Sequence, residues 1–121
     1  MDLDEKVPPE AKQVAVKFTE NLLRRDYPAA YAMTTRSYRA GRSLKSMRKD
    51  FERVVSLDWK LTGSIVPGMS SSKTASPDSR AEDVGWVYVP IPGEVYSEAV
   101  MVVVSREDGE LRIRKADFGR P

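Results

Sequence analysis

The sequence predicts an α+β fold in which three N-terminal helices pack on a curved antiparallel sheet of about four strands. Up to residue 56, apolar residues recur every three or four positions, which is typical of helices. After Leu57 they alternate with polar residues and β-branched types dominate, which is typical of strands. Helices that precede an antiparallel sheet along the chain define the α+β class. With 121 residues, the chain is expected to form one domain over 1–121.

The amino-acid composition excludes several kinds of catalytic and metal-binding site. The chain has no cysteine, so disulfides, thiolate metal sites and a cysteine nucleophile are absent. It has no histidine, which is the commonest general base near neutral pH and the commonest zinc ligand. No spacing of acidic residues gathers oxygen ligands in one loop. We therefore predict no metal site and no cofactor, and we assign no catalytic residue.

The N-terminus lacks the features of a targeting segment. Residues 1–6 are rich in acidic side chains, and no apolar run of a signal peptide follows them. No stretch approaches the roughly 20 apolar residues that span a bilayer. These observations favour a cytoplasmic protein with no membrane partner. The mature part of an exported chain remains the alternative.

The first helix is predicted to begin at Pro8-Pro9-Glu10, after a frayed lead-in over residues 1–7. Proline suits the first turn, where no N–H is needed, and the glutamate faces the positive end of the helix dipole. Arg24 and Arg25 are expected in the last turn, where cations suit the free carbonyl groups. One apolar stripe connects the two ends at helical spacing: Ala11, Val14, Ala15, Phe18 and Leu22.

Two shorter helices are expected next. Asp26 or Tyr27 caps the second helix, Pro28 opens it, and Thr34-Thr35 and Gly41 end it. Ser43 is a favoured N-cap residue for the third helix. The apolar stripe of this third helix consists of Leu44, Met47, Phe51, Val54 and Val55.

Four strands are predicted to follow as a meander. The first carries Trp59, Leu61 and Ile65 on one face. A long loop rich in proline, glycine and serine over 67–83 separates it from the second strand, Val84 to Val89. The segment Pro90-Ile91-Pro92-Gly93 is expected to form a turn, because proline cannot donate a hydrogen bond to the middle of a sheet.

The third strand is predicted from Val95 to Ser105 and the fourth from Leu111 to Phe118. Asp108-Gly109 between them is a favoured pair for a tight hairpin turn. From Val100 to Val104 apolar side chains fall on both faces of the third strand. One face packs on the helices, and an exposed apolar face usually marks an interface. The sequence thus predicts a homodimer that forms through the sheet.

This order of elements resembles the NTF2-like superfamily, the cone-shaped α+β fold of nuclear transport factor 2, ketosteroid isomerase and many small bacterial domains. Residues 22–31, Leu-Leu-Arg-Arg-Asp-Tyr-Pro-Ala-Ala-Tyr, are similar to the family's first helix, acidic–aromatic break and second helix. The resemblance covers residues 8–118. It implies a sheet curled around a cavity, used for small-molecule binding or catalysis, and dimers that pair sheet to sheet. The catalytic acids of the isomerase-type members have no residue-by-residue match here.

Four residues form the candidate ligand-binding set: Tyr31, Trp86, Tyr88 and Glu98. Aromatic rings with polar tips can line a pocket and orient a small hydrophobic or anionic ligand. A tyrosine hydroxyl could also act as an oxyanion donor in a chain without histidine. The alternative is that the aromatic rings fill the core between helices and sheet, with their polar tips at its rim.

A second candidate surface is basic, because residues 36–49 contain no acidic side chain. It could bind an anion or a phosphate-rich partner. Nucleic acid is not expected, because the net charge of the chain is only +2 and Gly41 and Ser43 divide the series between two elements. The alternative is a solvated or internally paired surface. The members of the series recur every three residues: Arg36, Arg39, Arg42, Lys45 and Arg48.

The function that the sequence predicts is a non-enzymatic, NTF2-like module that serves as a dimerising scaffold or a small-ligand-binding domain. One alternative is a small cone-fold enzyme of isomerase or hydrolase type. It would use a tyrosine and a carboxylate such as Asp58, Glu98 or Asp117, although arginines such as Arg112 and Arg114 could pair with these acids. Another alternative is an anion- or nucleic-acid-binding module built on residues 36–49. A cavity holding a desolvated carboxylate near a tyrosine hydroxyl would favour the enzyme.

Overall fold

The computed structural model describes residues 7–72 and 79–119, and these residues form an α+β fold. The helices described come first: α1 (Pro9–Leu23), α2 (Tyr27–Ala32), α3 (Arg36–Gly41) and α4 (Leu44–Val54). The strands follow: β1 (Ser70–Ser71), β2 (Asp83–Ile91), β3 (Glu98–Glu107) and β4 (Glu110–Gly119). They form one antiparallel sheet in the order β1-β2-β3-β4, which confirms the predicted meander.

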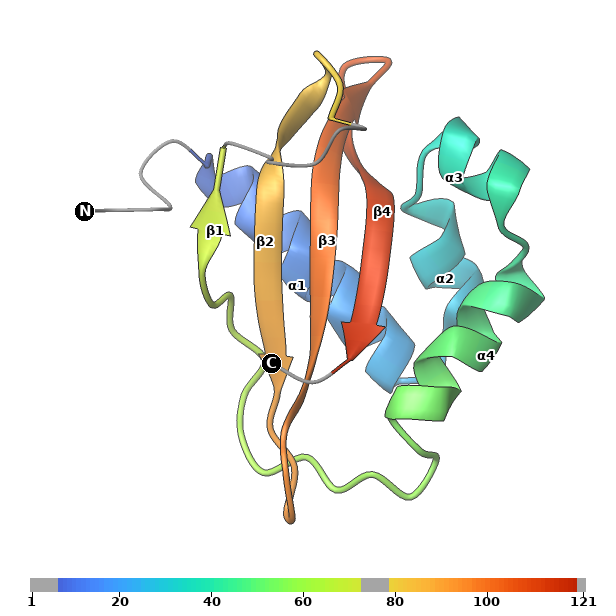
Figure 1. The fold of residues 1–121 in the computed structure, drawn as a ribbon, viewed down its shortest axis with the longest axis vertical. Coiled ribbons are helices and arrows are strands. Elements are labelled where there is room, and N and C mark those ends of the chain that lie inside the picture. The colour runs from blue at the N-terminus through green and yellow to red at the C-terminus, as the bar shows by residue number, and fades with distance from the viewer. Residues whose placement is uncertain (1–6, 73–78, 120–121) are drawn as a thin grey trace.

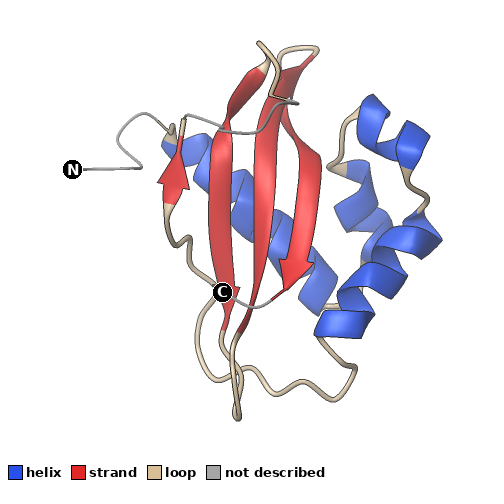
Figure 2. Ribbon diagram, viewed as in Figure 1, coloured by secondary structure: helices blue, strands red, loops and turns tan. Residues whose placement is uncertain are grey.

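Only one of these helices lies across the sheet. Helix α1 crosses behind β2, β3 and β4 and contacts all three, whereas α2, α3 and α4 lie beside β4 (Figure 1, Figure 2). The prediction that the N-terminal helices pack on the sheet therefore holds for α1, and the shorter helices meet the sheet mainly at one edge. The opposite face of the sheet carries no helix among the described residues.

The core lies between α1 and the sheet, as the apolar stripes predict. Ala11, Ala15, Phe18 and Leu22 of α1 are fully buried. The sheet contributes fully buried side chains from alternate positions of its strands: Val87, Val89, Ile91, Val100, Val102, Val104 and Ile113. Val7 is also buried, so the predicted frayed lead-in is wrong at its last residue, and residues 1–6 lie outside the described residues.

Polar N-cap residues determine where the short helices α2 and α3 begin. Thr35 was predicted only as part of the end of a helix, but its Oγ1 accepts a hydrogen bond from the N–H of Tyr38 at 3.2 Å and begins α3. The described residues therefore contain one helix more than the three predicted. Asp26 caps α2 as predicted, through the N–H of Ala29 at 3.2 Å.

The helix α1 ends two residues before the predicted end. The helix stops at Leu23, and Arg25 has a φ of +63°, in the left-handed region that helices cannot continue through. Arg24 and Arg25 therefore follow the helix instead of forming its last turn. The Arg25 guanidinium donates to the backbone oxygen of Ser56 at 2.6 Å, which ties the end of α1 to the end of α4.

The predicted first strand from Trp59 to Ile65 is wrong. Only Leu61 makes a bridge, to Gly93, and Trp59 instead packs edge-on against Tyr96 with 5.5 Å between ring centroids. Trp59 and Leu61 thus contact the β2–β3 turn and form no ladder of hydrogen bonds, whereas Ile65 lies in a hollow against α1. The strand beside β2 is β1, which falls inside the predicted loop over 67–83; residues 73–78 of that loop lie outside the described residues.

The predicted turn at 90–93 begins too early, because β2 continues through Pro90 to Ile91. The N–H of Tyr88 donates to the oxygen of Met69 at 2.8 Å, on the β1 side of the strand. The nitrogen of Pro90, two residues later, faces the same side beyond the end of the β1 pairing, so proline removes no ladder hydrogen bond there. The Asp108-Gly109 turn is confirmed, with φ values of +53° and +81°.

Candidate functional site

We call the side of the sheet away from α1 the open face. Its residues alternate along the strands with the core residues Val87 and Val102, which are fully buried. Met101, at its centre, is 39% exposed. Apolar side chains on both faces of β3 are thereby confirmed. The open face consists of Trp86, Tyr88 and Pro90 of β2, Ala99, Met101 and Val103 of β3, and Lys115 and Asp117 of β4.

The register of the strands arranges the centre of the open face as two adjacent rows. Trp86 pairs with Val103, which pairs with Lys115. In the next row, Tyr88 pairs with Met101, which pairs with Asp117. Each row thus runs from an aromatic ring through an aliphatic side chain to a charge. The charge is positive in one row and negative in the other.

Other segments of the chain form hydrogen bonds along the edge strand β4 and along β2 beyond the short edge strand β1. Along β4, the N–H of Thr35 donates to the oxygen of Ile113 and the N–H of Ile113 donates to the oxygen of Met33, each at 2.9 Å. Along β2, the N–H of Gly68 donates to the oxygen of Tyr88 at 2.7 Å. Occupied edges disfavour pairing with another strand. Among the β3 residues of the open face, Met101 is exposed, whereas Ala99 and Val103 are buried.

A buried ion pair closes one end of the open face. The Arg114 guanidinium donates through Nε and Nη2 to the two carboxylate oxygens of Asp83, both at 2.7 Å, and the two side chains are 7% and 4% exposed. The Ser105 hydroxyl, on the strand between them, donates to Asp83 at 2.5 Å. Burial alone would raise the pKa of Asp83, but the bonds from Arg114, Ser105 and the backbone N–H of Arg80 outweigh it and lower the pKa below its ordinary value.

The candidate ligand-binding set does not converge on one site. Trp86 and Tyr88 lie on the open face, whereas Glu98 is buried and pairs with the core residue Ile91. Tyr31 lies on α2, where its hydroxyl donates to the backbone oxygen of Arg42 at 2.7 Å and so joins α2 to the end of α3. Only Trp86 and Tyr88 are neighbours, at alternate positions of one strand.

The basic series is largely paired within the chain. Arg36 forms an ion pair with Asp108 at 2.6 Å, and Arg48 pairs with Glu52 at 3.3 Å. Arg42 pairs with Asp50, and the Arg39 guanidinium donates to the backbone oxygen of Thr34. These contacts agree with the alternative of an internally paired surface. The series is divided between two helices, because Arg36 and Arg39 lie on α3 and Lys45 and Arg48 lie on α4.

Two of the three acids proposed for the enzyme alternative, Asp58 and Asp117, lie in surroundings that do not suit a general base, whereas Glu98 is buried. A hydrogen bond from the Ser56 hydroxyl at 2.6 Å lowers the pKa of Asp58, which is the opposite of what a general base near neutral pH needs. Asp117 is exposed. The two arginines expected beside these acids pair elsewhere: Arg112 with Glu110 at 3.2 Å and Arg114 with Asp83.

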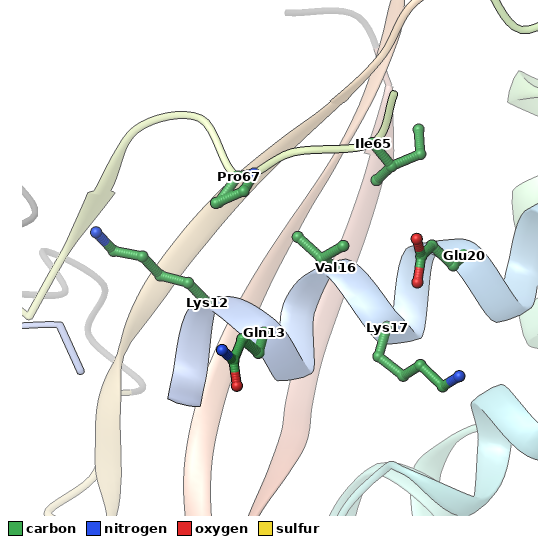
Figure 3. Close-up of a pocket in the computed structure, with 7 residues that line it drawn as sticks. All are labelled: Lys12, Gln13, Val16, Lys17, Glu20, Ile65 and Pro67. Carbon is green, nitrogen blue, oxygen red and sulfur yellow. The ribbon is translucent and has the colours of Figure 1, made fainter. Parts of the chain in front are cut away.

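One hollow of about 440 Å³ lies between α1 and the segment that follows α4. In Figure 3, Val16 of α1 faces Ile65 and Pro67, while Lys17 points away from them. The hollow has no tyrosine in its lining, and Glu20 supplies its one carboxylate. It therefore lacks the pairing of a desolvated acid with a tyrosine hydroxyl that the enzyme alternative requires. Its lining consists of Lys12, Gln13, Val16, Lys17, Glu20, Ile65 and Pro67.

A second hollow, of about 450 Å³, lies where α3 meets the β3–β4 turn and the start of β2. We call it the arginine groove. Arg36 is the one member of the predicted basic series that lines it. The sequence did not predict the groove as a whole, because its other lining residues come from separate segments with no shared spacing. Its lining consists of Thr35, Arg36, Ser37, Arg80, Glu82, Ser105, Arg106, Glu107, Asp108 and Arg114.

Comparison with known proteins adds no relative to this description. No family model, curated protein or solved structure gives a significant match to the chain. Within residues 7–72 and 79–119, no helix has both the length and the apolar character needed to cross a membrane. The described residues thus define an α+β domain with a four-stranded antiparallel meander.

Proposed function

We propose that this chain is a non-enzymatic module of NTF2-like design whose role is to hold two copies of itself together through the open face. The supporting observation is the pair of rows at the centre of this face, Trp86–Val103–Lys115 and Tyr88–Met101–Asp117. An exposed apolar side chain in the middle, Met101, and opposite charges at one side are features of an interface that fits its own copy.

A two-fold axis explains why the fit is to a second copy. If the axis runs across the strands between the two rows, β3 of one protomer lies over β3 of its partner in the opposite direction. Each row then faces the other row of the partner. Met101 meets Val103, and Lys115 meets Asp117 on both sides of the axis. Two sheets packed in this way would lie about 10 Å apart.

The size of the open face sets the expected strength of the dimer. Three strands of about ten residues cover a footprint of roughly 30 Å by 14 Å, or about 400 Å², at the usual strand dimensions. Standard interfaces bury about 800 Å² on each partner. The open face is therefore smaller than a standard specific interface, and we expect a weak dimer with a dissociation constant in the micromolar range.

Replacing Met101 by lysine should convert the dimer to a monomer at tens of micromolar chain. The side chain is 39% exposed, so the monomer can accommodate the substitution, but two ammonium groups would face an apolar partner surface. Sedimentation equilibrium measures the mass directly. Val95→Lys is the matched control, because Val95 is 87% exposed at the β2–β3 turn and lies outside the open face. Wild-type protein that sediments as a monomer at this concentration, or a Met101→Lys variant that stays dimeric, contradicts the proposal.

A further inference from the structure

The arginine groove contains charges that the chain itself neutralises and charges that it does not. Arg114 is held by Asp83, and Arg36 is held by Asp108 at 2.6 Å and Glu107 at 3.8 Å. These two guanidiniums are therefore neutralised within the protomer. Their acids also fix the walls of the groove, because they join α3 and β2 to the β3–β4 hairpin.

Arg80 and Arg106 differ from these two. Both line the groove and both are exposed, and neither guanidinium makes an ion pair or a hydrogen bond with any residue in the described part of the chain. The backbone holds the two residues near each other. The N–H of Arg106 donates to the oxygen of Glu82 at 2.9 Å, and the N–H of Arg80 donates to Asp83 at 2.9 Å.

We propose that the arginine groove binds a phosphate group, with Arg80 and Arg106 as the residues that hold it. Guanidinium is the side-chain group best suited to bind oxyanions, through paired N–H donors. The Ser37 hydroxyl lines the same groove and can add a hydrogen bond. This site lies outside the open face and each protomer forms it alone, so it stands whether or not the chain dimerises.

The charge balance of the groove selects phosphate over a carboxylate. Glu82 is exposed in the lining, and Glu107 is a second acid on Arg36 beside Asp108. These two acids offset much of the charge of the two unpaired arginines, so a ligand with a single negative charge gains little. A phosphate monoester carries close to two negative charges at neutral pH and offers three oxygens to the two guanidiniums. We therefore expect Glu82 to weaken phosphate binding and its removal to strengthen it.

The test is a titration of the full chain with inorganic phosphate, followed by ¹⁵N chemical shifts at constant ionic strength. Wild-type protein should saturate, with shifts at the backbone N–H of Arg106 and of its neighbours. Arg80→Gln and Arg106→Gln should each weaken binding roughly fivefold, which is the effect of one charge at contact distance in water. Glu82→Gln should strengthen binding by a similar factor. Arg53→Gln, an exposed arginine of α4 outside the groove, is the matched control and should bind as wild type does.

Three outcomes would overturn the proposal. The first is a titration that does not saturate, or one that chloride reproduces at equal ionic strength, because either result indicates general screening. The second is equal weakening by Arg53→Gln and Arg106→Gln, which would place binding on the whole basic surface. The third is weaker binding in Glu82→Gln. If acetate binds as tightly as phosphate, the groove recognises carboxylates and the selection argued from its charge balance is wrong.

Discussion

Replacing Arg114 by methionine should lower the free energy of unfolding by about 3–5 kcal/mol at neutral pH. The variant keeps Asp83 in place but removes the guanidinium that binds both of its oxygens at 2.7 Å. The aspartate side chain is only 4% exposed, so water cannot take over as its partner. Losing one member of a buried ion pair costs this much because the remaining charge is left uncompensated. Urea denaturation gives the free energy directly.

The loss of unfolding free energy in Arg114→Met should become smaller as the pH falls. In the wild type the pKa of Asp83 lies below its ordinary value of 3.8, so the ion pair contributes stability above that pH, and the contribution is lost as the pH falls through the lowered pKa. In Arg114→Met, burial without the arginine raises the pKa of Asp83, so its charge is a penalty that disappears on protonation. The difference in unfolding free energy between the wild type and Arg114→Met should therefore decrease as the pH is lowered from 7 toward 3.

The double variant Asp83→Asn/Arg114→Met is the control for this prediction. It removes both charges, so it should be more stable than Arg114→Met alone. A single variant that loses less than about 1 kcal/mol, or a loss that stays constant over the whole pH range, would show that the ion pair does not contribute as described.

Replacing Phe51 by alanine should also cost about 3–5 kcal/mol of unfolding free energy. Phe51 is fully buried on α4, and its ring packs edge-on against Tyr27 at 6.5 Å and Phe118 at 5.7 Å. The Arg25 guanidinium lies 5.3 Å from the same ring. The substitution therefore leaves a cavity where α4, α2 and β4 meet, and large-to-small changes at such positions have effects of this size.

Leu57→Ala is the comparison for Phe51→Ala. Leu57 is 70% exposed just after α4, so its loss should change stability by less than about 0.5 kcal/mol. Both variants can be measured by urea denaturation of the full chain. Similar values for the two would mean that α4 does not pack on β4 as the structure has it.

The sequence predicted the elements that hydrophobic periodicity controls. The stripe of α1 and the alternation along β3 both describe one buried face, so pattern alone located them. Helix α3 was missed because it has six residues and no stripe, and a single threonine cap starts it. Strand β1 was missed because Ser70 and Ser71 have no strand pattern and pair only through the backbone. The strand predicted at Trp59 is wrong because this side chain packs against Tyr96 of the β2–β3 turn.

The sequence could predict the open face but not the sites formed by distant segments. The apolar run along β3 predicts apolar residues on both faces of that strand. Only the register of β4 shows that Lys115 and Asp117 lie on the open face beside them. Arg114 and Asp83 are 31 positions apart, and Arg36 and Asp108 are 72 apart. No local spacing connects such pairs. Charge runs such as 36–49 show which residues are basic, but only the fold shows which of them are already neutralised.

The most direct test of the proposed self-pairing is a charge exchange on β4. In Lys115→Asp, two acidic groups face each other on each side of the two-fold axis, and the dissociation constant measured by sedimentation equilibrium should rise at least tenfold. The double variant Lys115→Asp/Asp117→Lys restores opposite charges across the axis, and its dissociation constant should return to within about threefold of the wild type. A double variant that stays as weak as the single one would contradict the account.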